Sequence, residues 1–349
     1  MAKKIHAIMA FLNVALFAYD PAAAADRHPV ETIEIASTFP LDLSLIGEGA
    51  RRLAAEVERA SGGELVLKLH EPGALVPAAD TVGAVAEGRI GGAWAGAGWF
   101  AKVDPAFNMF SSVPFGPDTT EYLAWLYHGG GLELARGMFH AHGIHNIPCL
   151  LIPPEASGWF KKEIRSTADL KGLTMRFFGL GARVVEKLGV VTRQLPPGDI
   201  PKAFADGSID AAEFSLPSID RPLDLQKSAK YYYFPGWHQQ ATFFDLYIRL
   251  DRWNALPERH RAIVELACGD TLRDAIARGE AAQSRALVQM KREGVQLRRW
   301  APDILVAFDK AWQEVVAEET RKSPRFETVY RSYTEFRSSY AVWKFLGSL

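Results

Sequence analysis

The hydrophobic and polar positions of the first 215 residues alternate between the patterns of strands and helices. Residues 32–37 form a short apolar run, and the apolar side chains of 46–57 then recur on one helical face. A Ser-Gly-Gly stop follows this helix, and residues 64–70 form the next apolar run. Strands that alternate with helices in this way predict an α/β fold in which helices flank mostly parallel sheets.

One pattern occurs twice along the chain. AVAEGRIGGAW (84–94) and AFADGSIDAAEF (203–214) both have the pattern of a helix end, a glycine cap and the entry into a strand. The simplest account is two α/β lobes built on the same plan, the first over 26–150 and the second over 151–252. Two such lobes with a cleft between them are typical of a hinged ligand-binding protein.

The chain becomes mainly helical from residue 253 onward. A helical pattern runs from Pro257 to Arg292, and a last helix is predicted over 323–346 with Ser323 as its N-cap. This last helix carries an aromatic stripe at spacings of three and four residues. We interpret the stripe as core, and the alternative is an exposed surface for dimerisation.

The first 25 residues have the pattern of an export signal. Lys3 and Lys4 precede a mostly apolar run over 7–19, and the small residues 23–25 then precede Asp26. The apolar run is too short to span a bilayer. We expect a signal peptide that is cleaved near Ala25 and a periplasmic mature protein. The alternative is a buried N-terminal helix.

Composition places the chain in the ordinary globular class. Of its residues 48% are hydrophobic and 23% charged, and the formal net charge is −1. This balance offers no electrostatic surface for nucleic acid or anionic lipid. The cysteines, Cys149 and Cys268, could pair in an oxidising compartment, but their apolar neighbours favour two unpaired buried thiols.

A cation at a strand-to-helix turn is the first candidate for a binding site. Arg176 ends a short apolar strand (173–178) that runs into Gly179-Leu-Gly181 and an amphipathic helix. A dinucleotide fingerprint would need a third glycine where Val184 stands. The planar guanidinium and the helix N-terminus fit a carboxylate instead. The alternative is a structural arginine that pairs with a neighbouring acid.

Motifs of catalysis are missing from the sequence. It contains no G-x-S-x-G, H-E-x-x-H or C-x-x-C pattern. His140, His142 and His145 lie close together, but no carboxylate or cysteine adjoins them, so a solvated turn is favoured over a metal site. Nothing in the spacing of Glu155 and Glu213 requires an acid–base pair. We therefore predict no catalytic residues.

Several segments resemble the substrate-binding proteins of TRAP transporters. They are GLTMRFFG, ADGSIDAAEF, YYYFPGWHQQ and WNALPERHRAIVELA. The chain is most similar to the branch that binds 2-oxo acids and related monocarboxylates, over essentially the whole mature sequence. The resemblance implies a two-lobed periplasmic binding fold, in which the helical region 253–349 bridges and packs on both lobes. It also implies a non-enzymatic receptor that delivers an organic acid to a TRAP permease.

The resemblance also implies a set of site residues. An arginine of the second lobe pairs with the ligand carboxylate, and Arg176 matches it. In the 2-oxo-acid branch a cation bridges ligand and protein, at positions that correspond here to Glu155, Glu213, the Phe214 carbonyl and Gln239. Such oxygen donors suit Na⁺ or Ca²⁺, and no organic cofactor is expected.

The sequence departs from the branch at three of these positions. Glu155 replaces a glutamine, Gln239 replaces a glutamate, and Phe214 replaces a tryptophan. Two glutamates and a ligand anion against Arg176 leave a charge of about −2, which a cation or a proton should balance. The ligand could therefore be a 2-hydroxy, sugar or aromatic acid instead of a 2-oxo acid. A secreted hydrolase or lyase using the two glutamates is the rival class of function.

The first lobe is expected to supply an aromatic wall to the site. Trp94 closes the first of the two repeated segments, and Trp99 and Phe100 follow shortly after it. Ordinary core packing is the alternative for each of the three. Among them, Trp99 is predicted to contact the ligand.

Overall fold

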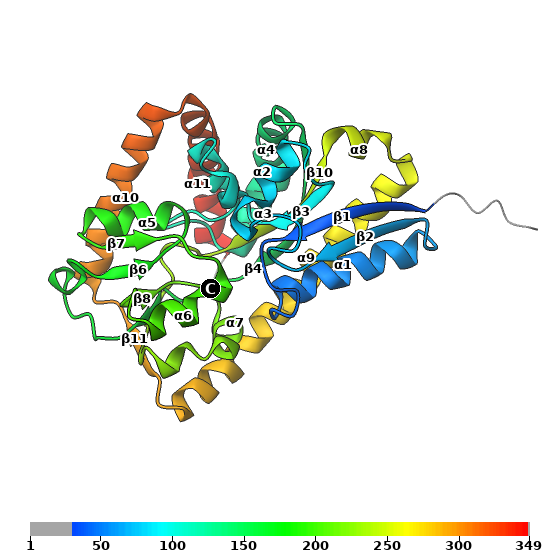
Figure 1. Cartoon of the computed structure of the whole chain (residues 1–349). Helices are drawn as coiled ribbons and strands as arrows, with labels where there is room; N and C mark the ends of the chain where they lie inside the picture. Colours follow the sequence, from blue (N-terminus) through cyan, green and yellow to red (C-terminus); the bar gives the residue numbers. More distant parts are fainter. Residues whose placement is uncertain (1–29, 348–349) are drawn as a thin grey trace, which may run out of the picture.

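Two β-sheets, one in each half of the molecule, form the framework of the computed structural model, which describes residues 30–347 (Figure 1). The predicted signal peptide lies outside the described residues. In sheet order, the first sheet consists of β2 (Leu65–His70), β1 (Glu31–Ser37), β3 (Gly92–Ala95), β10 (Thr242–Arg249) and β4 (Ile144–Ile152). The second consists of β11 (Gln296–Arg299), β9 (Tyr231–Phe234), β5 (Gly158–Phe160), β8 (Ala211–Ala212), β6 (Thr174–Arg176) and β7 (Val191–Arg193).

Each sheet is mostly parallel and contains one strand of opposite direction. β10 is antiparallel to β3 and β4, and β5 is antiparallel to β8 and β9. The expected α/β class is therefore confirmed. The chain passes from β4 of the first sheet into β5 of the second, and from β9 of the second back into β10 of the first. β10 therefore belongs to the first sheet although it falls within 151–252. The expected boundary between the lobes is thus not a single cut in the chain.

Helices cover both sheets. Those before β4 are α1 (Ile46–Ala60), α2 (Thr81–Ala86), α3 (Thr119–His128) and α4 (Gly131–His140); those after it are α5 (Gly179–Lys187), α6 (Ile200–Ala205), α7 (Pro217–Asp220) and α8 (Leu250–Ala255). The predicted glycine caps follow α2 and α6, where Gly88 and Gly207 have φ values of 71° and 77°. An L side chain rarely adopts this left-handed conformation, which explains glycine in both repeats.

The C-terminal helices connect the two halves. They are α9 (Glu258–Arg292), α10 (Pro302–Lys322) and α11 (Pro324–Gly347). α9 packs on α1 and β4 of the first half and on α7 of the second, whereas α10 packs on α5 and α11 returns to α3 (Figure 1). Within residues 30–347, no helix is both long and apolar enough to cross a membrane.

The aromatic stripe of α11 is core over only part of its length. Phe326, Val329 and Tyr333 are buried, whereas Trp343 and Phe345 near the C-terminal end are 65% and 84% exposed. The stripe is therefore core in the first part of the helix and exposed in its last part.

Cys149 in β4 and Cys268 in α9 form a disulfide bond, so the expectation of two unpaired thiols was wrong. Both cysteines are buried, as their apolar neighbours indicated. Burial does not distinguish a thiol from a disulfide, however, and the two residues lie 119 positions apart in the sequence. Only the packing of α9 on β4 brings them together.

The cluster of His140, His142 and His145 is also only in part the solvated turn that was expected. His145 is buried in β4 and stacks on Trp253 with ring centroids 4.3 Å apart. His140, at the end of α4, places its Nε2 3.0 Å from Nδ1 of His145. Only part of the segment is thus a solvated turn, because the last histidine belongs to the strand.

Removing the disulfide should destabilise the fold. We expect the Cys149→Ala/Cys268→Ala protein to lose about 2–4 kcal/mol of unfolding free energy, because the cross-link restricts the unfolded chain. Urea denaturation measures this loss. Reductant should lower the stability of the wild type and leave the double variant unchanged. Two titratable thiols in the denatured, unreduced wild type would contradict the disulfide.

Candidate functional site

A small cavity lies where the two sheets meet. Residues that follow β1, β3, β6 and β8 contribute to its lining, and ligands of open α/β sheets bind at such carboxyl ends. The lining residues are Phe39, Ile46, Gly96, Trp99, Ser111, Glu155, Arg176, Phe178, Glu213, Phe214, Ser215, Gln239, Thr242 and Phe244. The cavity volume open to water is about 30 Å³, which is enough to admit water. The site is therefore closely surrounded by side chains and suits a small ligand.

Two crossings of the chain between the sheets position part of the site. Residues 153–157 connect β4 to β5, and residues 235–241 connect β9 to β10. The backbone N–H of Glu155 donates to the carbonyl of Gln239 at 3.1 Å, and that of Gly236 donates to the carbonyl of Glu155 at 3.0 Å. A Cβ at Gly236 would lie 2.2 Å from this carbonyl oxygen, so the close approach of the two crossings requires glycine.

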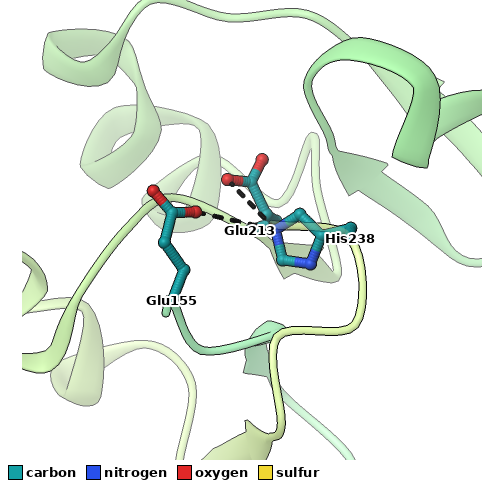
Figure 2. Close-up of side chains that lie close together, drawn as sticks. All are labelled: Glu155, Glu213 and His238. Atoms are coloured by element: carbon teal, nitrogen blue, oxygen red, sulfur yellow. Dashed lines mark ion pairs between the residues drawn. The ribbon is translucent and has the colours of Figure 1, made fainter. Parts of the chain in front are cut away.

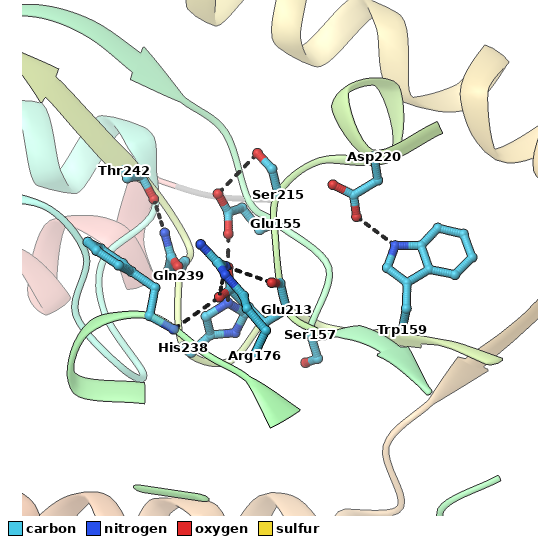
Figure 3. Close-up of polar contacts among 12 residues, drawn as sticks. Glu155, Ser157, Trp159, Arg176, Glu213, Ser215, Asp220, His238, Gln239 and Thr242 are labelled. Atoms are coloured by element: carbon cyan, nitrogen blue, oxygen red, sulfur yellow. Dashed lines mark hydrogen bonds and ion pairs between the residues drawn. The ribbon is translucent and has the colours of Figure 1, made fainter. Parts of the chain in front are cut away.

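Arg176 is buried at the end of β6 and is already partly paired. Its Nη1 donates to the backbone carbonyl of Glu213 at 2.7 Å and to Oε2 of the same residue at 2.6 Å, while Nε donates to the carbonyl of Leu195 at 3.1 Å (Figure 3). Among the hydrogen bonds of the described residues, none involves Nη2. Both interpretations of this arginine thus have support, since it pairs with an acid and also lines the cavity.

Two carboxylates lie side by side with Arg176. Glu213 Oε2 accepts a hydrogen bond from the Phe178 N–H at 3.2 Å, at the N-terminus of α5 where a ligand anion was expected. Glu155 Oε1 accepts a hydrogen bond from Ser215 Oγ at 3.3 Å, whereas its Oε2 is buried without a partner. The pKa of Glu155 is raised to about 8, chiefly because burial disfavours the charged carboxylate; the contact with His238 lowers this pKa and the nearby Glu213 raises it.

The sequence analysis missed His238 as part of this site. Its Nε2 lies 3.7 Å from Oε2 of Glu155 and 3.7 Å from Oε1 of Glu213 (Figure 2). Burial lowers the pKa of His238, but the contacts with the two glutamates outweigh this and raise it overall. In the sequence, only its position directly before the predicted site residue Gln239 could have indicated that His238 belongs to the site.

Most of the other predicted site residues line the cavity, but two of the three aromatic candidates do not. Of the three aromatic candidates only Trp99 lines it, whereas Trp94 donates from Nε1 to the Ile46 carbonyl in the core and Phe100 packs on Phe107. Trp99 lies 5.1 Å from Phe178 between ring centroids. The remaining predicted residues, Glu155, Arg176, Glu213, Phe214 and Gln239, all line the cavity.

The donor groups of the cavity fit a cation. Gln239 donates from Nε2 to Thr242 Oγ1 at 2.7 Å, and its Oε1 is buried and unpartnered. Glu155, whose Oε2 is also buried and unpartnered, lines the same cavity. Unpartnered carboxylate and amide oxygens are what a hard cation binds.

The chain belongs to the family described as bacterial extracellular solute-binding protein, family 7, also called DctP, which matches residues 36–323. Its members here are TRAP solute-binding proteins, so the resemblance found in the sequence is confirmed. The relatives include receptors for small organic acids, and TRAP receptors work with membrane permeases; the protein is a receptor of this class and not an enzyme.

Three relatives indicate what such receptors bind. The monocarboxylate 2-oxoacid-binding periplasmic protein of Nostoc sp. strain PCC 7120 is 33% identical over 301 residues, 86% of this chain and 83% of the relative. A TRAP solute-binding protein from Bordetella bronchiseptica RB50 (TM-score 0.88, 32% identity, 90% and 94% of the two chains) is a mixed-occupancy dimer with copurified calcium and picolinate in the bound active site. One from Pseudoalteromonas atlantica T6c (TM-score 0.87, 25% identity, 92% and 99%) holds sodium and pyruvate.

The stability of the ion-free and ligand-free protein should fall as the pH rises from about 4.5 to about 8. The Glu155 carboxyl titrates near 4.5 when unfolded and near 8 when folded, so the folded state holds an extra proton whose stabilisation is lost as pH rises. Glu155→Gln should reduce the slope of unfolding free energy by about 1 kcal/mol per pH unit. Urea denaturation at several pH values measures it.

The matched control is Glu327→Gln, on the exposed side of α11, which should keep the wild-type slope. A Glu155→Gln protein with the same pH dependence as the wild type would show that this carboxyl is not protonated in the fold.

Proposed function

We propose that the protein is the periplasmic receptor of a TRAP transporter for a small 2-oxo monocarboxylate, which it encloses between its two lobes and delivers to the permease. Arg176 binds the carboxylate of the ligand, and Trp99 and Phe214 form apolar walls. The observation that carries the proposal is a buried guanidinium whose Nη2 is left free in a cavity of this size. Nη2 makes no hydrogen bond to the described residues, and Arg176 lines the cavity, so this nitrogen is available to donate to the carboxylate of an acid.

A cation completes the proposed site. Glu155, Glu213, the Phe214 carbonyl and Gln239 would hold it, and it would supply the positive charge that two glutamates and a bound acid lack. The unpartnered oxygens of Glu155 and Gln239 support this assignment. The calcium and sodium of the relatives support it as well. A signal peptide cleaved near Ala25 would bring the receptor to the periplasm.

A planar aromatic acid is the second candidate ligand. The rings of Trp99 and Phe178 lie against each other at the cavity, and those of Phe39 and Phe244 are 5.3 Å apart beside them. Such rings favour a flat apolar ring on the ligand, and the relative from Bordetella bronchiseptica binds picolinate.

Replacing Arg176 tests the proposed carboxylate contact. In isothermal titration calorimetry with calcium present, Arg176→Ala should weaken the binding of pyruvate or picolinate by about 10–100-fold, because a charged hydrogen bond is lost. Arg176→Lys keeps the charge facing Glu213 and should recover only part of the affinity, since it lacks the planar fork.

The matched control is Arg193→Ala. Arg193 lies opposite Arg176 in the neighbouring strand β7, and its side chain is exposed. Wild-type affinity in Arg176→Ala would refute the assignment of the carboxylate to this arginine.

We also propose that the C-terminal part of α11 is a homodimer surface. Four apolar side chains, Val342, Trp343, Phe345 and Leu346, are 62–84% exposed there, and exposed apolar clusters of this kind mark contact surfaces. The first part of the same helix is packed in the core, which holds the exposed part in place. The relative from Bordetella bronchiseptica is a dimer.

Light scattering with size-exclusion chromatography tests this surface. The wild type should have the mass of a dimer, and Trp343→Ser/Phe345→Ser should have that of a monomer. Leu266→Ser removes an equally exposed apolar side chain from α9 and should stay dimeric. A monomeric wild type at micromolar concentration would rule out the proposed dimer.

A further inference from the structure

His238 lies beneath the two glutamates of the cavity and has a fixed orientation. Its ring stands against the ring of Phe177, with centroids 5.0 Å apart at 76°, and against Trp237 at 5.6 Å. Gly181 of α5 lies against both His238 and Phe177, since a Cβ there would come within 2.9 Å of the Cβ of His238 and 2.6 Å of the Phe177 ring. The histidine therefore has little freedom to turn its Nε2 away from the carboxylates.

The atoms that face one another here are buried and lack hydrogen bonds. Both ring nitrogens of His238 and Oε2 of Glu155 have no hydrogen-bond partner, and both residues are at least 97% buried. The separations of 3.7 Å between Nε2 and the two carboxylate oxygens are too long for hydrogen bonds. These three polar side chains converge without hydrogen bonds to one another, so the protein itself provides no partner for the buried atoms that lack one.

One metal ion would satisfy all three groups. Nitrogen and oxygen donors bind zinc at about 2.0–2.2 Å, so two donors of one ion lie roughly 3–4 Å apart. The two measured separations of 3.7 Å fall within this interval, and one donor atom from each of Glu155, Glu213 and His238 lies within 4.8 Å of the others. Figure 2 shows the imidazole nitrogen directed between the two carboxylates.

The charge of the loaded site favours a divalent ion. Glu155, Glu213 and a bound monocarboxylate contribute three negative charges, and Arg176 contributes one positive charge. A divalent ion with neutral His238 brings the sum to zero, whereas a sodium ion leaves one negative charge buried. A neutral imidazole is also the form that binds metals.

We infer that His238 is a metal ligand together with Glu155 and Glu213, and that this receptor selects a divalent transition metal such as Zn²⁺ over Ca²⁺ and Na⁺. Imidazole suits zinc, nickel and copper, whereas calcium takes oxygen ligands. The inference rests on the proposed function, because the ion lies at the same cavity and leaves its remaining coordination positions to the organic acid. It adds a nitrogen ligand to the oxygen donors of the proposed cation site.

Metal titration without any organic acid tests the inference. The mature protein is stripped with EDTA, dialysed, and titrated with ZnCl₂ and with CaCl₂ in separate calorimetric experiments. We expect zinc to bind at least about tenfold more tightly than calcium. His238→Gln should lower the zinc affinity at least about tenfold, since even the outer-shell partners of metal ligands are worth 10–100-fold, and should leave calcium binding little changed.

Matched variants separate this site from other histidines. His140→Gln removes one member of the His140–His145 pair and should leave the zinc affinity unchanged. Glu155→Gln should weaken zinc binding like His238→Gln, which keeps the test decisive if one variant fails to fold. Cobalt provides a spectroscopic readout, because its visible absorption should change when the nitrogen ligand is removed in His238→Gln.

Equal affinities for zinc and calcium, or an unchanged zinc affinity in His238→Gln, would overturn the inference. Pyruvate or picolinate is then added to the zinc-loaded and the calcium-loaded protein. Binding that occurs with calcium alone overturns the metal selection and leaves the receptor function standing. The zinc titration needs no organic acid. A protein that binds zinc but no acid would therefore refute the proposed function without refuting the metal site.

Discussion

The burial of two carboxylates beside a single guanidinium is the constraint on which the site depends. Glu155 and Glu213 are almost fully excluded from solvent, and Arg176 pairs directly with only the second of them. Burying an unpaired carboxylate costs several kcal/mol unless it is protonated or finds a positive partner. The ion-free protein meets this cost by raising the pKa of Glu155 to about 8, and in the proposed loaded receptor a cation would meet it.

The fold places this cluster where the two halves of the chain are connected. Glu155 lies on one crossing between the sheets and Gln239 on the other, and backbone hydrogen bonds join the two crossings. α9 spans both halves, and the disulfide fixes it to β4 next to the first crossing. A ligand at the cavity therefore contacts both sheets and their connections at once, which is how a two-lobed receptor couples binding to the arrangement of its lobes.

The sequence contained most of the local structure and the identity of most site residues. Alternating strand and helix patterns predicted the α/β class. The resemblance placed Glu155, Arg176, Glu213, Phe214 and Gln239 at one site, and the first repeated segment added Trp99; all of them line the cavity. Local patterns could not show contacts made across long stretches of chain. The disulfide joins residues 119 positions apart, and β10 pairs with the sheet that the chain had left before β5. His238 escaped notice for the same reason, because its importance comes from two glutamates on other segments.

A crystal structure of the mature protein grown with pyruvate and zinc, with data collected on both sides of the zinc absorption edge, tests the account most directly. The account predicts one anomalous peak bounded by Glu155, Glu213 and His238, and an acid whose carboxylate lies within hydrogen-bonding distance of Arg176 Nη2. An acid bound elsewhere, with the Arg176 guanidinium satisfied entirely by protein groups, would contradict it.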